Sequence, residues 1–87
     1  MTYRELAIWQ EEDGQIQHKA FTSISSLTGF MTDLLKHTPY DRVWNLDTDG
    51  DWYISKKDSY AVMFTETENI PPHIKLYVLM LGNWSEP

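Results

Sequence analysis

Apolar and polar residues alternate in two runs near the start of the chain, residues 3–10 and 15–21, which is the pattern of half-buried β-strands. The segment between them, 11–14, reads EEDG, and Asp13-Gly14 is a strong short-range signal for a tight turn. These features predict an N-terminal β-hairpin.

The apolar period then changes to that of an amphipathic helix. Apolar residues recur three or four positions apart: Ile24, Leu27, Met31 and Leu34. Thr22 or Ser23 is placed to cap the start of the helix, and Pro39 marks its exit.

Alternation returns in residues 42–46 and 52–56, and a β-rich run follows at 60–65. We expect these three segments to form an antiparallel meander. The alternation assigns two sets of side chains to opposite faces: Trp44, Leu46 and Tyr53 to one, and Val43, Trp52 and Ile54 to the other.

The last segment, NIPPHIKLYVLMLGNWSEP, fits two structures. As a strand, its apolar residues would occupy both faces. As a helix, it begins with Pro71 or Pro72 and ends at Gly82, and its apolar stripe is Ile74, Tyr77, Val78 and Leu81. We favour the helix. It leaves three apolar side chains outside the stripe, Leu76, Leu79 and Met80, and we expect these to form a homodimer contact or a docking face for a partner.

The element order is therefore ββαβββα in one small domain, 1–87. The expected fold is α+β, with an antiparallel sheet of up to five strands and one or two helices on one face. The chain has no cysteine, which excludes disulfides and thiolate chemistry.

The charge and the ends of the chain limit partners and location. A formal net charge of −6 argues against direct binding to nucleic acid. The N-terminus lacks the pattern of a signal peptide, and the longest apolar run, 76–81, is too short to span a bilayer. We expect a cytoplasmic protein without membrane contact.

The acidic stretch DTDGDWYISKKD resembles an EF-hand calcium loop over twelve residues. Its ligands would be Asp47, Asp49, Asp51, Ser55 and Asp58. Two positions depart from the pattern, because Trp52 stands where the loop needs glycine and Asp58 where it needs glutamate. A calcium-binding domain is thus one alternative.

A hairpin turn explains the same stretch better. Asp49-Gly50 suits the centre of a two-residue type I′ turn, which places Leu46 opposite Tyr53. The carboxylates of this turn and of the segment after the last strand then gather at one edge of the sheet: Asp47, Asp49, Asp51, Glu66 and Glu68. Such an edge suits a partner protein with a basic surface. We therefore predict a non-enzymatic interaction module, either an adaptor or an inhibitor of the phage-encoded type.

A small enzyme is the second alternative. The three histidines, His18, His37 and His73, show no zinc-ligand spacing, and no nucleophile or phosphate-binding motif is present. The sequence indicates no catalytic residue, cofactor or metal beyond the calcium alternative.

Overall fold

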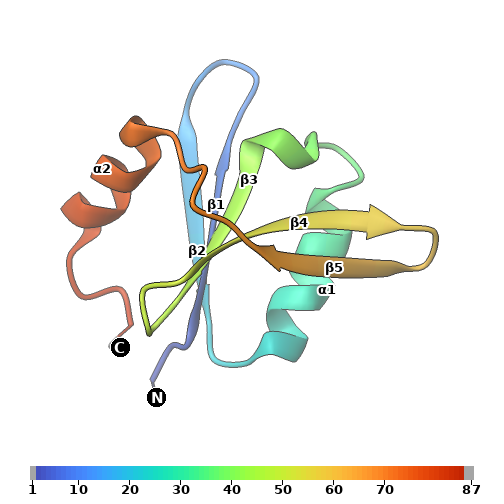
Figure 1. Ribbon diagram of the computed structural model, residues 1–87, viewed down its shortest axis with the longest axis horizontal. Coiled ribbons are helices and arrows are strands. Elements are labelled where there is room, and N and C mark those ends of the chain that lie inside the picture. Colours follow the sequence, from blue (N-terminus) through green and yellow to red (C-terminus); the bar gives the residue numbers. More distant parts are fainter. Residues whose placement is uncertain (1, 86–87) are drawn as a thin grey trace.

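A computed structural model describes residues 2–85 of the chain. These residues form a five-stranded antiparallel sheet with the strand order β2-β1-β3-β4-β5 and two α-helices (Figure 1). The elements are β1 (Glu5–Gln10), β2 (Ile16–Phe21), α1 (Ile24–Leu34), β3 (Val43–Asp47), β4 (Trp52–Asp58), β5 (Ala61–Glu66) and α2 (Pro72–Leu81), with a short 3-10 turn (Tyr40–Arg42) before β3. The predicted α+β class and the element order are confirmed.

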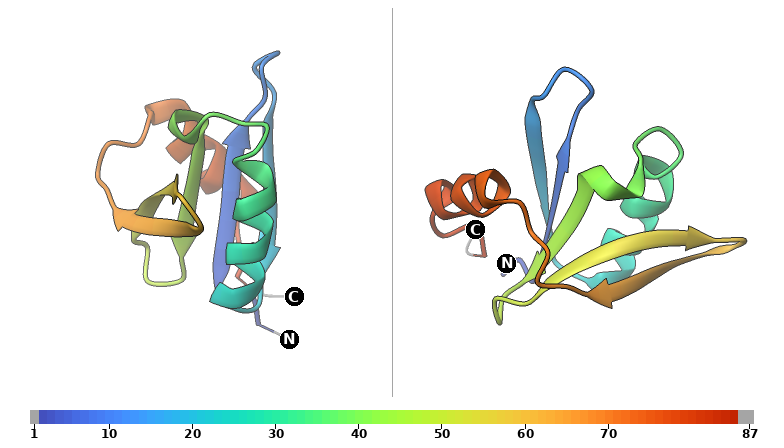
Figure 2. Two further views of the ribbon diagram at one scale, coloured as in Figure 1. Left: turned by 90° about the vertical axis from the view of Figure 1, so that its right-hand side faces the viewer. Right: turned by 45° about the horizontal axis from the view of Figure 1, so that its top comes forward.

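The two helices lie on opposite faces of the sheet, which corrects the expectation that helices share one face (Figure 2). The alternation of β1 makes this possible, because Leu6 and Ile8 point to one face and Ala7 to the other, and all three are fully buried. The core under α2 contains Leu6, Ile8, Trp44, Leu46, Ile70, Ile74 and Val78. The core under α1 contains Ala7, Phe21, Leu27, Met31 and Val43.

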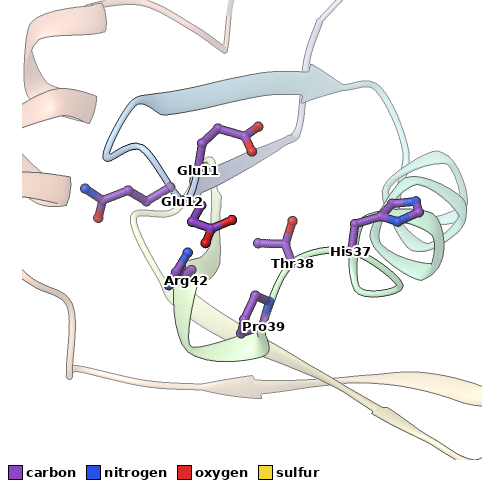
Figure 3. A pocket seen from close by; sticks show the side chains of 7 residues that line it. Glu11, Glu12, His37, Thr38, Pro39 and Arg42 are labelled. Atoms are coloured by element: carbon purple, nitrogen blue, oxygen red, sulfur yellow. The ribbon is translucent and has the colours of Figure 1, made fainter.

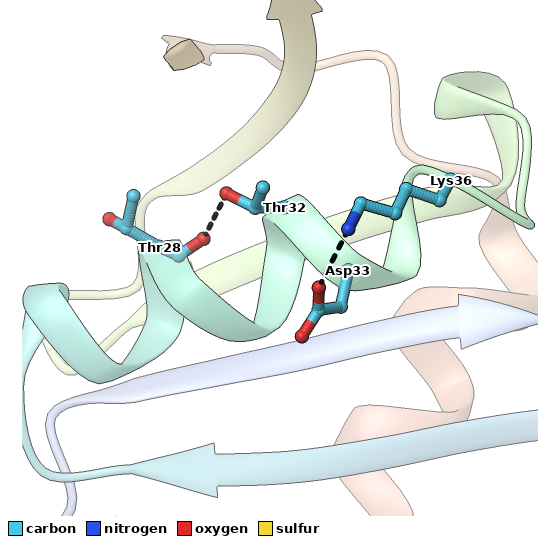
Figure 4. A network of polar contacts seen from close by, with 4 residues as sticks. All are labelled: Thr28, Thr32, Asp33 and Lys36. Carbon is cyan, nitrogen blue, oxygen red and sulfur yellow. Dashed lines mark hydrogen bonds and ion pairs between the residues drawn. The ribbon is translucent and has the colours of Figure 1, made fainter. Parts of the chain in front are cut away.

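Helix α1 begins at the predicted cap. The Oγ of Ser23 accepts a hydrogen bond from the backbone N–H of Ser26 at 3.2 Å. Polar side chains of the helix and of the turn after it are satisfied locally: Thr32 donates to the carbonyl of Thr28, and Lys36 pairs with Asp33 at 3.3 Å (Figure 4).

The C-terminal segment is a helix, as favoured from the sequence. Pro72 occupies the first turn, and Gly82 adopts a positive φ of 72° directly after the last residue. Ile74 and Val78 are buried against the sheet. Across residues 2–85, neither helix has the length and apolar character needed to cross a membrane.

Candidate protein-interaction site at the acidic edge

The turn between β3 and β4 is organised by Asp47. Its Oδ1 accepts hydrogen bonds from the backbone N–H groups of Asp49 at 3.0 Å and Asp51 at 2.9 Å. The backbone N–H of Asp47 also donates to the carbonyl of Asp51 at 3.1 Å, so these two residues close the hairpin. Asp47 thus has a structural role as well as a charge.

The loop contains three residues, Thr48, Asp49 and Gly50, so the predicted two-residue type I′ turn is wrong. A type I′ turn requires positive φ at both central residues, whereas here only Gly50 has one, at 90°. A three-residue loop that ends in a left-handed glycine is the next common hairpin connection.

The longer loop changes which side chains share a face. Leu46 pairs with Trp52 and Trp44 pairs with Ile54, so all four belong to the face covered by α2. Tyr53 pairs with Asn45 and lies on the α1 face. The predicted assignments of Trp52, Tyr53 and Ile54 are therefore exchanged, because a shift of one residue moves a side chain to the opposite face.

The twelve-residue calcium loop is not formed. Asp47, Asp49 and Asp51 bring carboxylate oxygens within 4.8 Å of one another. The other two expected ligands, however, belong to strand β4: Ser55 is fully buried opposite Phe64, and Asp58 pairs with Ala61 at the far end. An extended strand cannot wrap around an ion at the turn, so Ser55 and Asp58 do not join the three aspartates in an EF-hand arrangement in this structure.

The segment after β5 lies beside this turn. The backbone N–H of Thr67 donates to the carbonyl of Trp52 at 2.8 Å. This contact brings Glu66 and Glu68 to a hollow of about 440 Å³ that Asp51 also lines. Lys75 of α2 lines the same hollow and is a cation at this edge that sequence analysis did not place there.

A further carboxylate, from Glu5, reaches the same end of the sheet on the α1 face. Glu5 is directly opposite Asp47 in the β1–β3 pair. Burial and the negative charge of Asp47 raise the pKa of Glu5, while a hydrogen bond from the Asn45 side chain lowers it in part. We call the group Glu5, Asp47, Asp49, Asp51, Glu66 and Glu68 the acidic edge.

Tyr53 links this edge to the sheet. Its hydroxyl donates to Oδ2 of Asp47 at 3.1 Å. Burial, that hydrogen bond and the negative charge of the surrounding carboxylates together raise the pKa of Tyr53 to about 12.

The apolar residues predicted to lie outside the α2 stripe are exposed. Leu76, Leu79 and Met80 are 56%, 76% and 79% exposed. Leu76 and Leu79 line a hollow of about 690 Å³ together with Leu46, Trp52 and Val78. This apolar surface adjoins the acidic edge, since Gly50, Trp52 and Lys75 line both hollows.

The opposite end of β1 carries a separate polar hollow of about 330 Å³, lined by Glu11, Glu12, Arg42 and the 37–39 segment (Figure 3). In Figure 3, His37 lies apart from Glu12 and Arg42, at the end of α1. The carboxylate of Glu11 accepts a hydrogen bond from the indole N–H of Trp9 at 2.9 Å. Within residues 2–85 no hydrogen bond joins His37 to Thr38 or to either glutamate, so the hollow lacks a nucleophile paired with a base.

The other two histidines connect α2 to the first hairpin. Nδ1 of His18 lies 2.7 Å from the hydroxyl of Tyr77, and Nε2 of His73 lies 3.1 Å from Oε1 of Gln10. Both contacts join residues that are distant in the sequence. These histidines therefore have a structural explanation, which their positions in the sequence did not reveal.

The chain matches no protein-family model, and no curated protein or solved structure is significantly similar to it.

Proposed function

We propose that this protein is a non-enzymatic interaction module that binds a basic surface of another protein through the acidic edge. The proposal rests on one observation. Carboxylates from three separate parts of the chain, residue 5 and segments 47–51 and 66–68, lie together at one end of the sheet. Clustered exposed carboxylates create a field that speeds the association of a positively charged partner.

Three features support binding over catalysis. The carboxylates of Asp49, Asp51, Glu66 and Glu68 are exposed, in the β3–β4 connection, at the end of β5 and directly after it, where a protein surface can reach them. The net charge of −6 favours a basic protein over direct contact with nucleic acid. Within the described residues, the polar hollow around Glu12 and His37 does not pair a nucleophile with a base.

A module of this kind acts as an inhibitor or an adaptor, depending on what the bound surface does for the partner. An inhibitor would cover a basic functional groove, as phage-encoded acidic inhibitors do. We place this activity in the cytoplasm. The apolar surface of Leu76, Leu79 and Met80 is a second contact surface, which we assign to a homodimer.

The test begins with affinity capture of the tagged protein from its host's lysate. Association of the captured partner is then measured with Glu66→Gln/Glu68→Gln and with the control Glu11→Gln/Glu12→Gln, which removes the same charge from the opposite end. We expect only the first variant to slow association and to reduce its salt dependence, since exposed charges are screened over about 8–10 Å at physiological salt. Equal rates and equal salt slopes for both variants would refute the proposal.

A further inference from the structure

A small cavity opens on the α1 face of the sheet, behind the acidic edge. Its volume is about 190 Å³, several times the roughly 30 Å³ that one water occupies in the liquid. It is lined by Glu5, Ile24, Asn45, Asp47, Tyr53 and Phe64. Four different elements, β1, β3, β4 and β5, and the first residue of α1 therefore build it.

The polar groups of the cavity include one buried acceptor without a hydrogen-bond partner among the described residues. Asn45 is only 1% exposed, and its Oδ1 has no hydrogen-bond partner within residues 2–85. Asp47 uses both carboxylate oxygens to accept hydrogen bonds from the turn and from Tyr53. Buried hydrogen-bond acceptors are ordinarily paired. A donor on a bound molecule would therefore complete the hydrogen bonding of Asn45.

The charges of the residues that line the cavity indicate that this donor group is positively charged. Glu5 and Asp47 are neighbours across the β1–β3 pair, and none of the residues that line the cavity is a cation. Burial and then the negative charge of Asp47 raise the pKa of Glu5, and the hydrogen bond from Asn45 offsets them only in part. A positively charged group would relieve the repulsion between the two carboxylates.

The apolar walls specify the shape of the group. Ile24 and Phe64 add apolar walls to the carboxylates of the cavity, and an aromatic ring such as that of Phe64 can attract a cation over its face. Calcium would require six or more oxygen ligands, and magnesium several bound waters, which two apolar walls do not provide. A primary ammonium on an alkyl stem satisfies both the acceptors and the walls, because it is a compact charge with three donors.

We propose that this cavity binds a lysine side chain of the protein partner. The ammonium is held by Glu5 and the free Oδ1 of Asn45, and the stem lies against Ile24 and Phe64. Ile24 is 54% exposed, so this apolar wall of the cavity borders the solvent. This assignment rests on the proposed function. The acidic edge attracts the basic surface of the partner, and the cavity then holds one lysine of that surface.

The test is an NMR titration with Nα-acetyl-lysine-N-methylamide at constant ionic strength. The matched probe is the norleucine derivative, which has the same stem without the charge. We expect the lysine derivative to shift the signals of Asn45 and Ile24 in a saturable way, and the norleucine derivative to leave them unchanged. Glu5→Gln should weaken the lysine derivative's binding at least about tenfold, as expected for the loss of a charge-assisted hydrogen bond, whereas Glu12→Gln should not.

Equal shifts from both probes, or shifts from calcium chloride but not from lysine, would overturn the assignment. Thermal denaturation of Glu5→Gln checks that the variant is folded, and Phe64→Leu supplies a second variant that keeps all charges and should also weaken binding. The two proposals fail separately. If the partner's association depends on Glu66 and Glu68 but lysine does not bind, only the cavity assignment is lost. If lysine binds but the partner is insensitive to the edge, only the proposed function is lost.

Discussion

The hydroxyl of Tyr53 donates a hydrogen bond to Oδ2 of Asp47 across 3.1 Å, and this contact ties the β3–β4 turn to the strand that follows it. The phenol is half-buried and surrounded by carboxylates, so its ionised form is disfavoured.

We expect Tyr53 to titrate near pH 12 rather than near its ordinary value of 10. Because the folded protein holds the proton more tightly than the unfolded chain, the stabilisation is complete below pH 10 and is lost between pH 10 and 12. Absorbance of tyrosinate against pH would show this late step in the wild type and its absence in Tyr53→Phe. A wild-type curve in which every tyrosine titrates near pH 10 would contradict the prediction.

The raised pKa of Glu5 leads to a prediction about the stability of the fold at neutral pH. Its pKa is raised in the folded state, so stability is lost as the pH rises through that pKa and Glu5 becomes charged. Glu5→Gln cannot ionise and should therefore raise the melting temperature at pH 7. The advantage should shrink as the pH falls through the raised pKa of Glu5 and be lost below the ordinary glutamate value of 4.5, where the wild-type side chain is also neutral.

Thermal melts of both proteins from pH 3 to 8 would measure this difference, with Glu12→Gln as the exposed control. A lower melting temperature for Glu5→Gln at pH 7 would show that ionised Glu5 stabilises the fold. Together with the lysine titration, a more stable variant that binds less well would separate the role of Glu5 in binding from its effect on stability.

The β3–β4 turn depends on the backbone of Gly50. Its φ of 90° is strained for any residue with a Cβ, although an added methyl group would meet no atom within 4 Å. Gly50→Ala should therefore lower the free energy of unfolding by about 1–2 kcal/mol through the backbone alone.

Gly29 provides a matched control for this substitution. It lies inside α1 with a helical φ, and an added Cβ there also meets nothing within 4 Å. Gly29→Ala should raise the free energy of unfolding by roughly 0.5–1 kcal/mol. Urea denaturation measures both changes, and a destabilisation of equal size at the two glycines would argue against the positive-φ explanation.

The sequence predicted the helices and strands more reliably than the face of the sheet on which each side chain lies. The period of Ile74, Tyr77, Val78 and Leu81 identified α2 correctly, because a buried stripe and a terminal Gly82 are both local signals. Asp49-Gly50 identified the hairpin correctly but not its loop length. The length is decided by the side chain of Asp47, which caps the three-residue loop, and by the burial of Trp52 and Ile54 under α2.

The candidate site was predicted only in part for a related reason. The turn and the 66–68 segment were expected at one edge because strands of a meander are consecutive. Glu5 was not expected there, because β1 pairs with β3, a strand from which β2 and α1 separate it in the sequence. The unpaired Oδ1 of Asn45 could not be predicted from the sequence, because its hydrogen bonding depends on which side chains fill the α1 face.

The exposed side of α2 leads to the last prediction, which concerns self-association. Leu79 and Met80 are the most exposed apolar residues of the helix, and contact between two copies would bury them. Each copy carries a net charge of −6, so repulsion opposes the dimer at low salt and is screened at high salt. We expect a weak dimer that strengthens as salt is added, the reverse of the salt dependence expected for the basic partner.

Sedimentation velocity at several protein concentrations, in low and high salt, would reveal this dimer. Leu79→Gln/Met80→Gln should remain a monomer in both, with its stability changed by no more than about 0.5 kcal/mol for each substitution, since both side chains are exposed in the monomer. Glu66→Gln/Glu68→Gln should instead dimerise at lower salt than the wild type, because it reduces the repulsion without touching the apolar contact. A wild type that stays monomeric at every salt concentration would refute the assignment of the α2 surface to a homodimer.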